Sequence, residues 1–200
     1  MRYEHPRSAK LLKWFARKKK LGVPLSGTYF RAAGPRHTTA KDIVSGIGAS
    51  KAGGRWNPIA NSMKVVYLSD EPETALREAN EHYRYYGLPL SDGLPKVVVA
   101  VQVDLERILD FTECSFVKTI PEALDSILLE DWRAIMSRGA EATSQTLGWA
   151  VFAAGFQGML VPSKAAPAGV NLLVFPDALG KKTKLVVLNR GVLDKLGGPS

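Results

Sequence analysis

The sequence is poor in the features of secreted and membrane-spanning proteins. Its one cysteine, Cys114, cannot form a disulfide within the chain, and no export signal opens the sequence. The longest apolar runs, such as residues 97–101, fall far short of the roughly 20 residues that cross a bilayer. We therefore expect a soluble protein of the reducing cytoplasm that has no membrane partner.

Several signatures of catalysis and nucleotide binding are also missing. The three histidines, His5, His37 and His82, have no second ligand at the spacing of a zinc site, so we expect no metal site. The chain has no G-x-S-x-G turn for a serine nucleophile. It also has neither the G-x-x-x-x-G-K-[ST] nor the G-x-G-x-x-G phosphate-binding loop. These absences argue against a zinc enzyme, a serine hydrolase and the common nucleotide-binding folds.

Length and charge narrow the remaining classes. The chain has 200 residues, of which 46% are hydrophobic, so it can bury a substantial core within a single domain. Lys and Arg number 27 against 19 Asp and Glu, which gives a net charge of +8. Such a charge favours an anionic partner, which could be a nucleic acid, a phosphate-bearing small molecule or an acidic protein.

The first half of the chain predicts helices and strands separated by one long loop. Residues 8–21 predict an N-terminal helix, and the basic run 17–20 suits its C-terminal end. Residues 34–54 lack periodicity and predict a surface loop of a length that is usually functional or disordered. A β-branched and aromatic strand at 64–69 then leads into a helix at 70–87, which has an acidic, proline-containing first turn.

Strand and helix patterns follow each other irregularly in the whole chain. Helical patterns at 121–138 and 144–155 interrupt the strands, and the short segment 107–112 is expected to pair with its neighbour 95–105. Because strands and helices do not alternate cleanly, we predict an α+β sheet with flanking helices rather than a doubly wound parallel sheet. The predicted strands are 27–33, 64–69, 95–105, 107–112, 158–163, 170–176 and 184–189.

Single polar residues stand at the ends of several predicted strands. They are Arg31, Arg55, Tyr67 and Ser163, and Glu78 lies on the helix that follows one of these strands. Strand ends that converge on one opening can build a pocket, and the helical position of Glu78 places its carboxylate at the edge of an apolar face. Each residue also has an ordinary explanation, as a surface arginine, a strand aromatic, a solvated glutamate or a turn serine.

Taken in order, these residues and their neighbours resemble the RES domain, a bacterial toxin family named after an arginine, a glutamate and a serine in separate motifs. The resemblance covers residues 27–175 and supplies Arg31, Tyr67, Glu78 and Ser163. The matching segments are YFR at 29–31, SGIGA at 45–49, GGRWNP at 53–58, VVYLSDEPETALRE at 65–78, GFQGMLVPS at 155–163 and VNLLVF at 170–175.

The resemblance implies a fold and an activity. The expected fold is similar to that of ADP-ribosyltransferases, with a split, mixed or antiparallel β-sheet core, and residues 1–200 would form a single RES domain. The expected activity is cleavage of the nicotinamide–ribose bond of NAD+ by hydrolysis or phosphorolysis, without a cofactor. RES toxins are usually encoded beside a DNA-binding antitoxin, so the expected partners are this antitoxin, NAD+ and inorganic phosphate.

The resemblance also implies a role for each candidate residue. Arg31 and Arg55 would bind phosphate oxygens, because guanidinium is permanently charged and can bind them bidentately. Glu78 would stabilise the positive charge that develops on the ribose. Tyr67 would bracket the nicotinamide, and Ser163 would orient the ribose or the nicotinamide.

Two alternatives remain open from the sequence. The same site could transfer ADP-ribose to a protein or nucleotide acceptor, because different acceptors can attack the same face of the ribose. A basic module that binds nucleic acid is disfavoured, since the cations cluster only at 16–20 and Glu78 would repel a phosphate backbone. We expect no direct binding of nucleic acid, and the sequence leaves open whether the chain forms a homo-oligomer.

Overall fold

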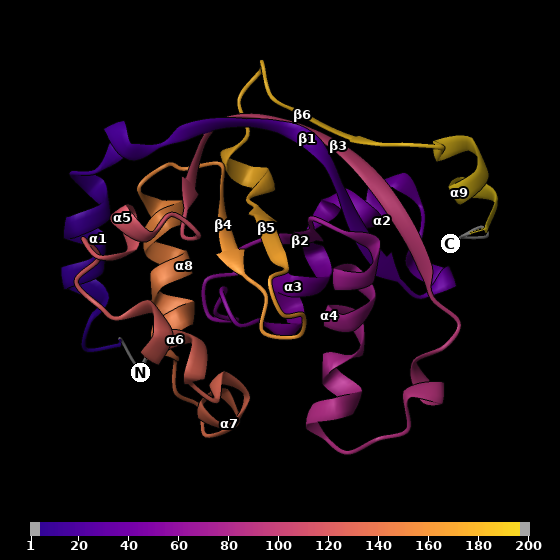
Figure 1. Cartoon of the computed structure of the whole chain (residues 1–200), viewed down its shortest axis with the longest axis horizontal. Coiled ribbons are helices and arrows are strands. Elements are labelled where there is room, and N and C mark those ends of the chain that lie inside the picture. The colour runs from indigo at the N-terminus through magenta and orange to yellow at the C-terminus, as the bar shows by residue number, and fades with distance from the viewer. Residues whose placement is uncertain (1–4, 197–200) are drawn as a thin grey trace.

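The computed structural model describes residues 5–196, which form a curved six-stranded sheet with helices under both of its ends (Figure 1). The two long strands arch over the top of the molecule in this view, with α1 and α8 below one end and α4 below the other. The strands are β1 (Val23–Ala33), β2 (Val66–Ser69), β3 (Val97–Asp110), β4 (Gly158–Pro162), β5 (Val170–Val174) and β6 (Lys184–Val187). The α-helices are α1 (Ser8–Ala16), α2 (Ala40–Ser45), α3 (Ile47–Ala52), α4 (Pro72–Tyr85), α5 (Cys114–Val117), α6 (Leu124–Leu129), α7 (Trp132–Ser137), α8 (Thr143–Ala153) and α9 (Arg190–Leu196).

The sheet is mixed, and its two long strands, β1 and β3, pair with each other as well as with shorter strands. Its order is β1-β2-β5-β4-β3-β6, and β1 also pairs with β3 along most of its length. The pairing of β3 with β4 is parallel, whereas the other pairings are antiparallel. The α+β class with a mixed, split sheet, as predicted from the sequence, is thereby confirmed.

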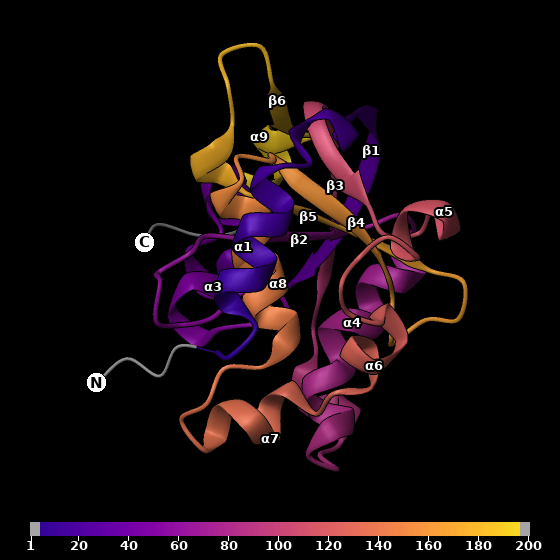
Figure 2. The same ribbon diagram turned by 90° about the vertical axis from the view of Figure 1, so that its left-hand side faces the viewer.

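Both faces of the central strands are buried. Alternate residues of a strand point to opposite faces, so Leu173 faces one hydrophobic cluster while its neighbours Leu172 and Val174 face the other. The first cluster lies under α1 and α8, which pack side by side (Figure 2). The second includes Ile43 of α2, which is fully buried. This double burial explains the nearly continuous apolar runs in these strands.

The structure corrects the predicted N-terminal helix over 8–21. Helix α1 ends at Ala16, and a separate 3-10 turn follows at Lys19–Leu21. The backbone N–H of Arg17 bonds the Trp14 carbonyl oxygen at 3.2 Å and that of Lys18 bonds the Phe15 carbonyl oxygen at 2.9 Å, which closes the helix at the start of the basic run. Most of the cations therefore lie beyond the last helical turn.

The predicted loop at 34–54 is also wrong, because this segment contains α2 and α3. The Thr39 side chain caps α2 by accepting a hydrogen bond from the Asp42 N–H at 3.2 Å. Gly46, with φ of 65°, separates the two helices in a left-handed conformation that favours glycine. Helices this short gain most of their stability from tertiary burial, so they leave little periodicity in the sequence.

One strand is longer than expected. Residues 107–110 do not form a separate strand but continue β3, which reaches Asp110. The last residues of β3 pair with β4, so the strand is stabilised beyond its contact with β1. No helix within residues 5–196 is both long and apolar enough to cross a membrane.

Candidate functional site

A small pocket lies between the sheet and α4, and several of the residues singled out in the sequence line it. Its volume is about 210 Å³. Three of the five predicted site residues, Arg31, Tyr67 and Glu78, lie on its wall. The full lining is Phe30, Arg31 and Ala32 from β1, Tyr67 and Ser69 from β2, Ala75, Glu78 and Ala79 from α4, and Asn171 from β5.

Glu78 is held in place by two hydrogen-bond donors from distant parts of the chain. Its Oε1 accepts hydrogen bonds of 2.6 Å from both the Ser163 hydroxyl and the Asn171 Nδ2. Within residues 5–196, no donor bonds the other oxygen, Oε2. Bonds to a carboxylate are charge-assisted and strong, so they fix the side chain and leave one oxygen available to a ligand.

The orientation of Ser163 is fixed as well. Its hydroxyl oxygen accepts hydrogen bonds from the N–H groups of Ala165 and Ala166 at 3.2 and 3.1 Å. The hydroxyl proton is therefore directed to Glu78. Ser163 does not line the pocket itself, so its direct contact is with the carboxylate.

Asn171 is a site residue that the sequence reasoning missed. It stands opposite Ser69 in the antiparallel pairing of β5 with β2. The Ser69 hydroxyl donates to Asn171 Oδ1 at 2.8 Å, which directs the Asn171 amide nitrogen toward Glu78. The only signal in the sequence was one polar residue within the apolar segment 170–175.

Arg31 contributes a positive charge to the pocket wall. Its Nη1 donates to the Ile43 carbonyl at 3.0 Å, and none of the ion pairs within residues 5–196 involves it. Burial lowers the pKa of the Arg31 guanidinium, and nearby Asp42 acts in the opposite direction. A partly buried cation without an ion-pair partner is well suited to an anionic ligand.

Tyr67 presents its ring to the pocket while its hydroxyl is anchored behind it. The hydroxyl donates to Asn57 Oδ1 at 2.7 Å and accepts from the Trp56 N–H at 3.3 Å. Burial raises the pKa of Tyr67, so the phenol stays neutral. A Cβ on Gly54 would lie 2.5 Å from this hydroxyl oxygen, which explains why a glycine occupies the turn.

Arg55 lies near the pocket but does not line it. Its Nη1 donates to the carbonyl oxygens of Leu128 and Glu130 at 3.1 and 3.3 Å, so it fastens the connection between α6 and α7. Burial lowers the pKa of Arg55, and so does the positive charge of nearby Arg133. Glu78 raises it, so Arg55 lies within electrostatic reach of the pocket.

The RES domain family model matches residues 28–189, which is most of the chain. The chain belongs to the RES domain family. The resemblance inferred from the sequence is therefore confirmed, and the pocket with Arg31, Tyr67 and Glu78 is the candidate site of this RES protein.

The RES protein is similar to named relatives and to a solved structure, and toxins are among them. It is 29% identical to the Prs ADP-ribosylating toxin of a Sphingobium species over 81% of this chain and 92% of that one. It is 28% identical to the NAD(+) phosphorylase MbcT of Mycobacterium tuberculosis over 70% of this chain and 69% of that one. It matches a chain in the crystal structure of the M. tuberculosis MbcT–MbcA toxin–antitoxin complex with a TM-score of 0.65, at 23% identity over 95% of this chain and 98% of that one.

A larger hollow elsewhere does not compete for the role of catalytic site. It has a volume of about 720 Å³ and is walled by residues such as His5, Glu141 and Trp149, and it shares no lining residue with the smaller pocket. None of the residues that carry the RES motifs' arginine, glutamate or serine lies there. Among the described residues, no group of three or more histidine, cysteine or acidic side chains could hold a metal ion.

Proposed function

We propose that this RES protein is a toxin that depletes NAD+ by cleaving the bond between nicotinamide and ribose. The observation that carries the proposal is the pocket in which Glu78, held by Ser163 and Asn171, faces the same space as Arg31 and Tyr67. The names of the relatives support it, since one is an NAD(+) phosphorylase and another an ADP-ribosylating toxin.

The residues of the pocket match the charges that change in this reaction. When the glycosidic bond breaks, its electron pair goes to the nicotinamide nitrogen, which becomes neutral, while positive charge develops on the ribose. The free Oε2 of Glu78 would accept hydrogen bonds from ribose hydroxyls and stabilise that charge. Arg31 would bind a phosphate oxygen, and the ring of Tyr67 would bracket the nicotinamide. NAD+ is then the substrate, and the reaction uses no resident cofactor.

The acceptor that bonds to the ribose is water or inorganic phosphate in this proposal. A second candidate function is transfer of ADP-ribose to a protein or nucleotide, and it is favoured by the similarity to the Sphingobium ADP-ribosylating toxin. A nucleic-acid-binding module is the weakest candidate, because a carboxylate at the centre of the pocket would repel a phosphate backbone.

A cognate antitoxin completes the proposal. The MbcT–MbcA complex supports a protein partner, since it is a complex of a toxin with an antitoxin. We infer that the antitoxin of this chain inserts acidic groups near Arg31 and Arg55 and that the toxin acts in the cytoplasm, where NAD+ is available. An Arg31→Ala, Arg55→Ala double variant that binds the antitoxin as tightly as wild type, combined with no displacement by saturating NAD+, would contradict this mode of inhibition. Whether the toxin forms a homo-oligomer is tested separately by its mass in solution.

The deciding experiment is incubation of the purified chain with NAD+, with and without phosphate. Free nicotinamide and the ribosyl product are both measured by chromatography. Release of nicotinamide that depends on phosphate supports phosphorolysis, and release without phosphate supports hydrolysis. Label from NAD+ on a protein or nucleotide acceptor would favour the transferase alternative. If no nicotinamide is released in any condition, the proposed function is wrong.

A further inference from the structure

The pocket around Glu78 is too small to enclose a whole dinucleotide. Its volume of about 210 Å³ lies below the ~300–1,000 Å³ typical of pockets that enclose a drug-sized ligand. The nicotinamide riboside end is enough to fill it. If NAD+ is the substrate, as the proposed function states, its adenosine and the phosphate beside it must lie against the surface outside this pocket.

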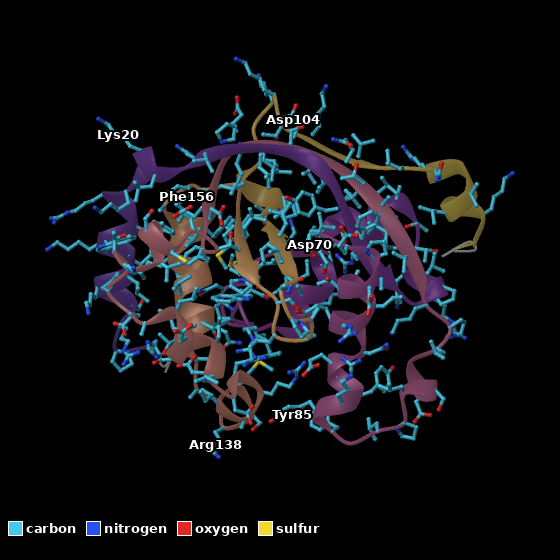
Figure 3. The ribbon with its side chains drawn as sticks, viewed as in Figure 1. Lys20, Asp70, Tyr85, Asp104, Arg138 and Phe156 are labelled. Atoms are coloured by element: carbon cyan, nitrogen blue, oxygen red, sulfur yellow. The ribbon has the colours of Figure 1, made fainter. Side chains whose placement is uncertain are left out.

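Helix α4 leads from the pocket to a second group of residues. Tyr85 follows Glu78 by seven residues, which is close to two helical turns, so both side chains lie on the same face of α4. Seven residues of α-helix span about 10 Å, which is the length scale of a nucleotide. In Figure 3 the Tyr85 side chain projects from α4 toward α7.

Two arginines also connect the pocket around Glu78 with the surroundings of Tyr85. Arg55 donates to carbonyl oxygens just before α7, the helix that carries Arg133, and the charges of Glu78 and Arg133 shift the pKa of Arg55 in opposite directions. None of the ion pairs within residues 5–196 involves either arginine. Two neighbouring cations without an ion-pair partner repel each other, and an anion placed between them would relieve this repulsion.

Arg133 itself lies close to two aromatic rings. Its guanidinium carbon is 4.5 Å from the centre of the Trp132 ring and 4.9 Å from the centre of the Tyr85 ring. The Tyr85 hydroxyl donates to both carboxylate oxygens of Asp131 at 2.9 Å, and Asp131 also accepts from the Ala134 N–H at 3.0 Å. The acidic group beside the rings is therefore already engaged, and it fixes the position of Tyr85.

We propose that Tyr85, Trp132 and Arg133 form a binding site for the adenylate half of the dinucleotide. The Arg133 guanidinium would bind phosphate oxygens together with Arg55, and an aromatic ring would stack on the adenine. The aromatic rings suit the adenine of adenosine monophosphate (AMP), and the arginines suit its phosphate. Both α4 and Arg55 connect this site with the pocket around Glu78. It would make the enzyme prefer a dinucleotide over a mononucleotide.

The competing explanation is that this stack only fastens α7 to α4. If the stack only fastens the helices, removing one of its side chains should mainly lower the melting temperature. Binding of AMP separates the two explanations, because AMP carries the adenine and a phosphate but lacks the nicotinamide riboside that the pocket around Glu78 would hold. AMP binding also requires no catalysis, so it can be measured by titration calorimetry whether or not NAD+ is cleaved.

We expect AMP to bind the wild-type chain and to compete with NAD+. Arg133→Ala and Trp132→Ala should each weaken AMP binding about tenfold, on the scale of one charge-assisted bond or one stacked base. Tyr85→Phe should retain more affinity than Tyr85→Ala, because the ring is kept. Arg138→Ala is the matched control, since it removes the same charge just beyond the other end of α7, where Arg138 is exposed and points away from the body of the molecule (Figure 3).

Two results would overturn the adenylate site. The first is a wild-type chain that does not bind AMP at millimolar concentration. The second is AMP affinity that is the same in Arg133→Ala and Trp132→Ala as in Arg138→Ala, whatever the change in melting temperature. Failure of the proposed function is a different result, namely AMP binding that depends on these residues in a chain that releases no nicotinamide.

Discussion

Replacing Glu78 by glutamine tests the central role assigned to its carboxylate. The exchange keeps the size and shape of the side chain, and the Oε1 of glutamine can still accept the two bonds that Ser163 and Asn171 donate at 2.6 Å. The negative charge is lost, and the free Oε2 is replaced by an amide nitrogen, which can still bond a ribose hydroxyl by donating to its oxygen. The pocket should therefore keep its geometry, while positive charge on the ribose in the transition state loses its stabilising partner.

The expected loss can be estimated from comparable groups. Removing one preorganised group that stabilises transition-state charge costs about 10²–10³-fold in kcat, or roughly 2.7–4 kcal/mol. Because the hydrogen bonds to Ser163 and Asn171 remain, the melting temperature should change little and KM for NAD+ should stay close to wild type. A fall confined to kcat indicates an interaction made in the transition state rather than in the bound substrate.

The assay is release of nicotinamide at saturating NAD+, measured beside the far-ultraviolet circular dichroism of each variant. Glu73→Gln is the control, because Glu73 lies on the same helix but is paired with Arg77 in an exposed ion pair. This control should keep its activity. A folded Glu78→Gln enzyme that turns over within a few-fold of wild type would show that the carboxylate is not needed for the chemistry.

Further variants test Arg31, Asn171 and a close contact in the core. Arg31→Ala should lower kcat/KM for NAD+ at least tenfold. Arg31→Lys should restore only part of this loss, since lysine lacks the planar guanidinium that binds two oxygens at once. Full recovery in steady-state kinetics would mean that charge alone matters. Asn171→Ala removes one hydrogen bond to the Glu78 carboxylate, so kcat should fall about 10–100-fold while KM changes less. An unchanged kcat would show that Asn171 does not position the carboxylate. Gly148→Ala would place a Cβ 1.9 Å from the Trp56 carbonyl oxygen and should cost about 1–3 kcal/mol in the free energy of unfolding. In the same denaturation experiment Gly48→Ala should not destabilise, because its Cβ meets nothing within 4 Å, and equal stabilities of the two variants would contradict the close contact.

Some of the site could be predicted from local patterns in the sequence. The helix that carries Glu78 has Pro72 in its first turn and Gly87 beyond its end, so its limits were close to those observed. Its amphipathic pattern also placed Glu78 at the edge of the apolar face. Such features depend on residues a few positions apart, and the sequence records them directly.

Other features depended on contacts that local patterns do not encode. Thr39 and the buried Ile43 stabilise a short helix where the sequence predicted a loop, because capping and burial outweigh weak propensity. The end of α1 was misplaced because cations that suit a helix terminus occur equally well in the turn beyond it. Residues 107–110 continue β3 because β4, about 50 residues later, pairs with them.

The sequence by itself determined the family and the strands and helices with strong periodicity, and it predicted Arg31, Tyr67, Glu78 and Ser163 as candidate site residues. Tertiary structure decided how these residues act on one another. Ser163 and Asn171 are separated from Glu78 by 85 and 93 residues, and only the pairing of the strands brings both to one carboxylate oxygen. The tertiary structure also turns Arg55 away from the pocket wall, so that its guanidinium bonds carbonyl groups just before α7. The physical reason is that chain closure over such separations is set by the packing of the whole sheet, which no short stretch of residues specifies.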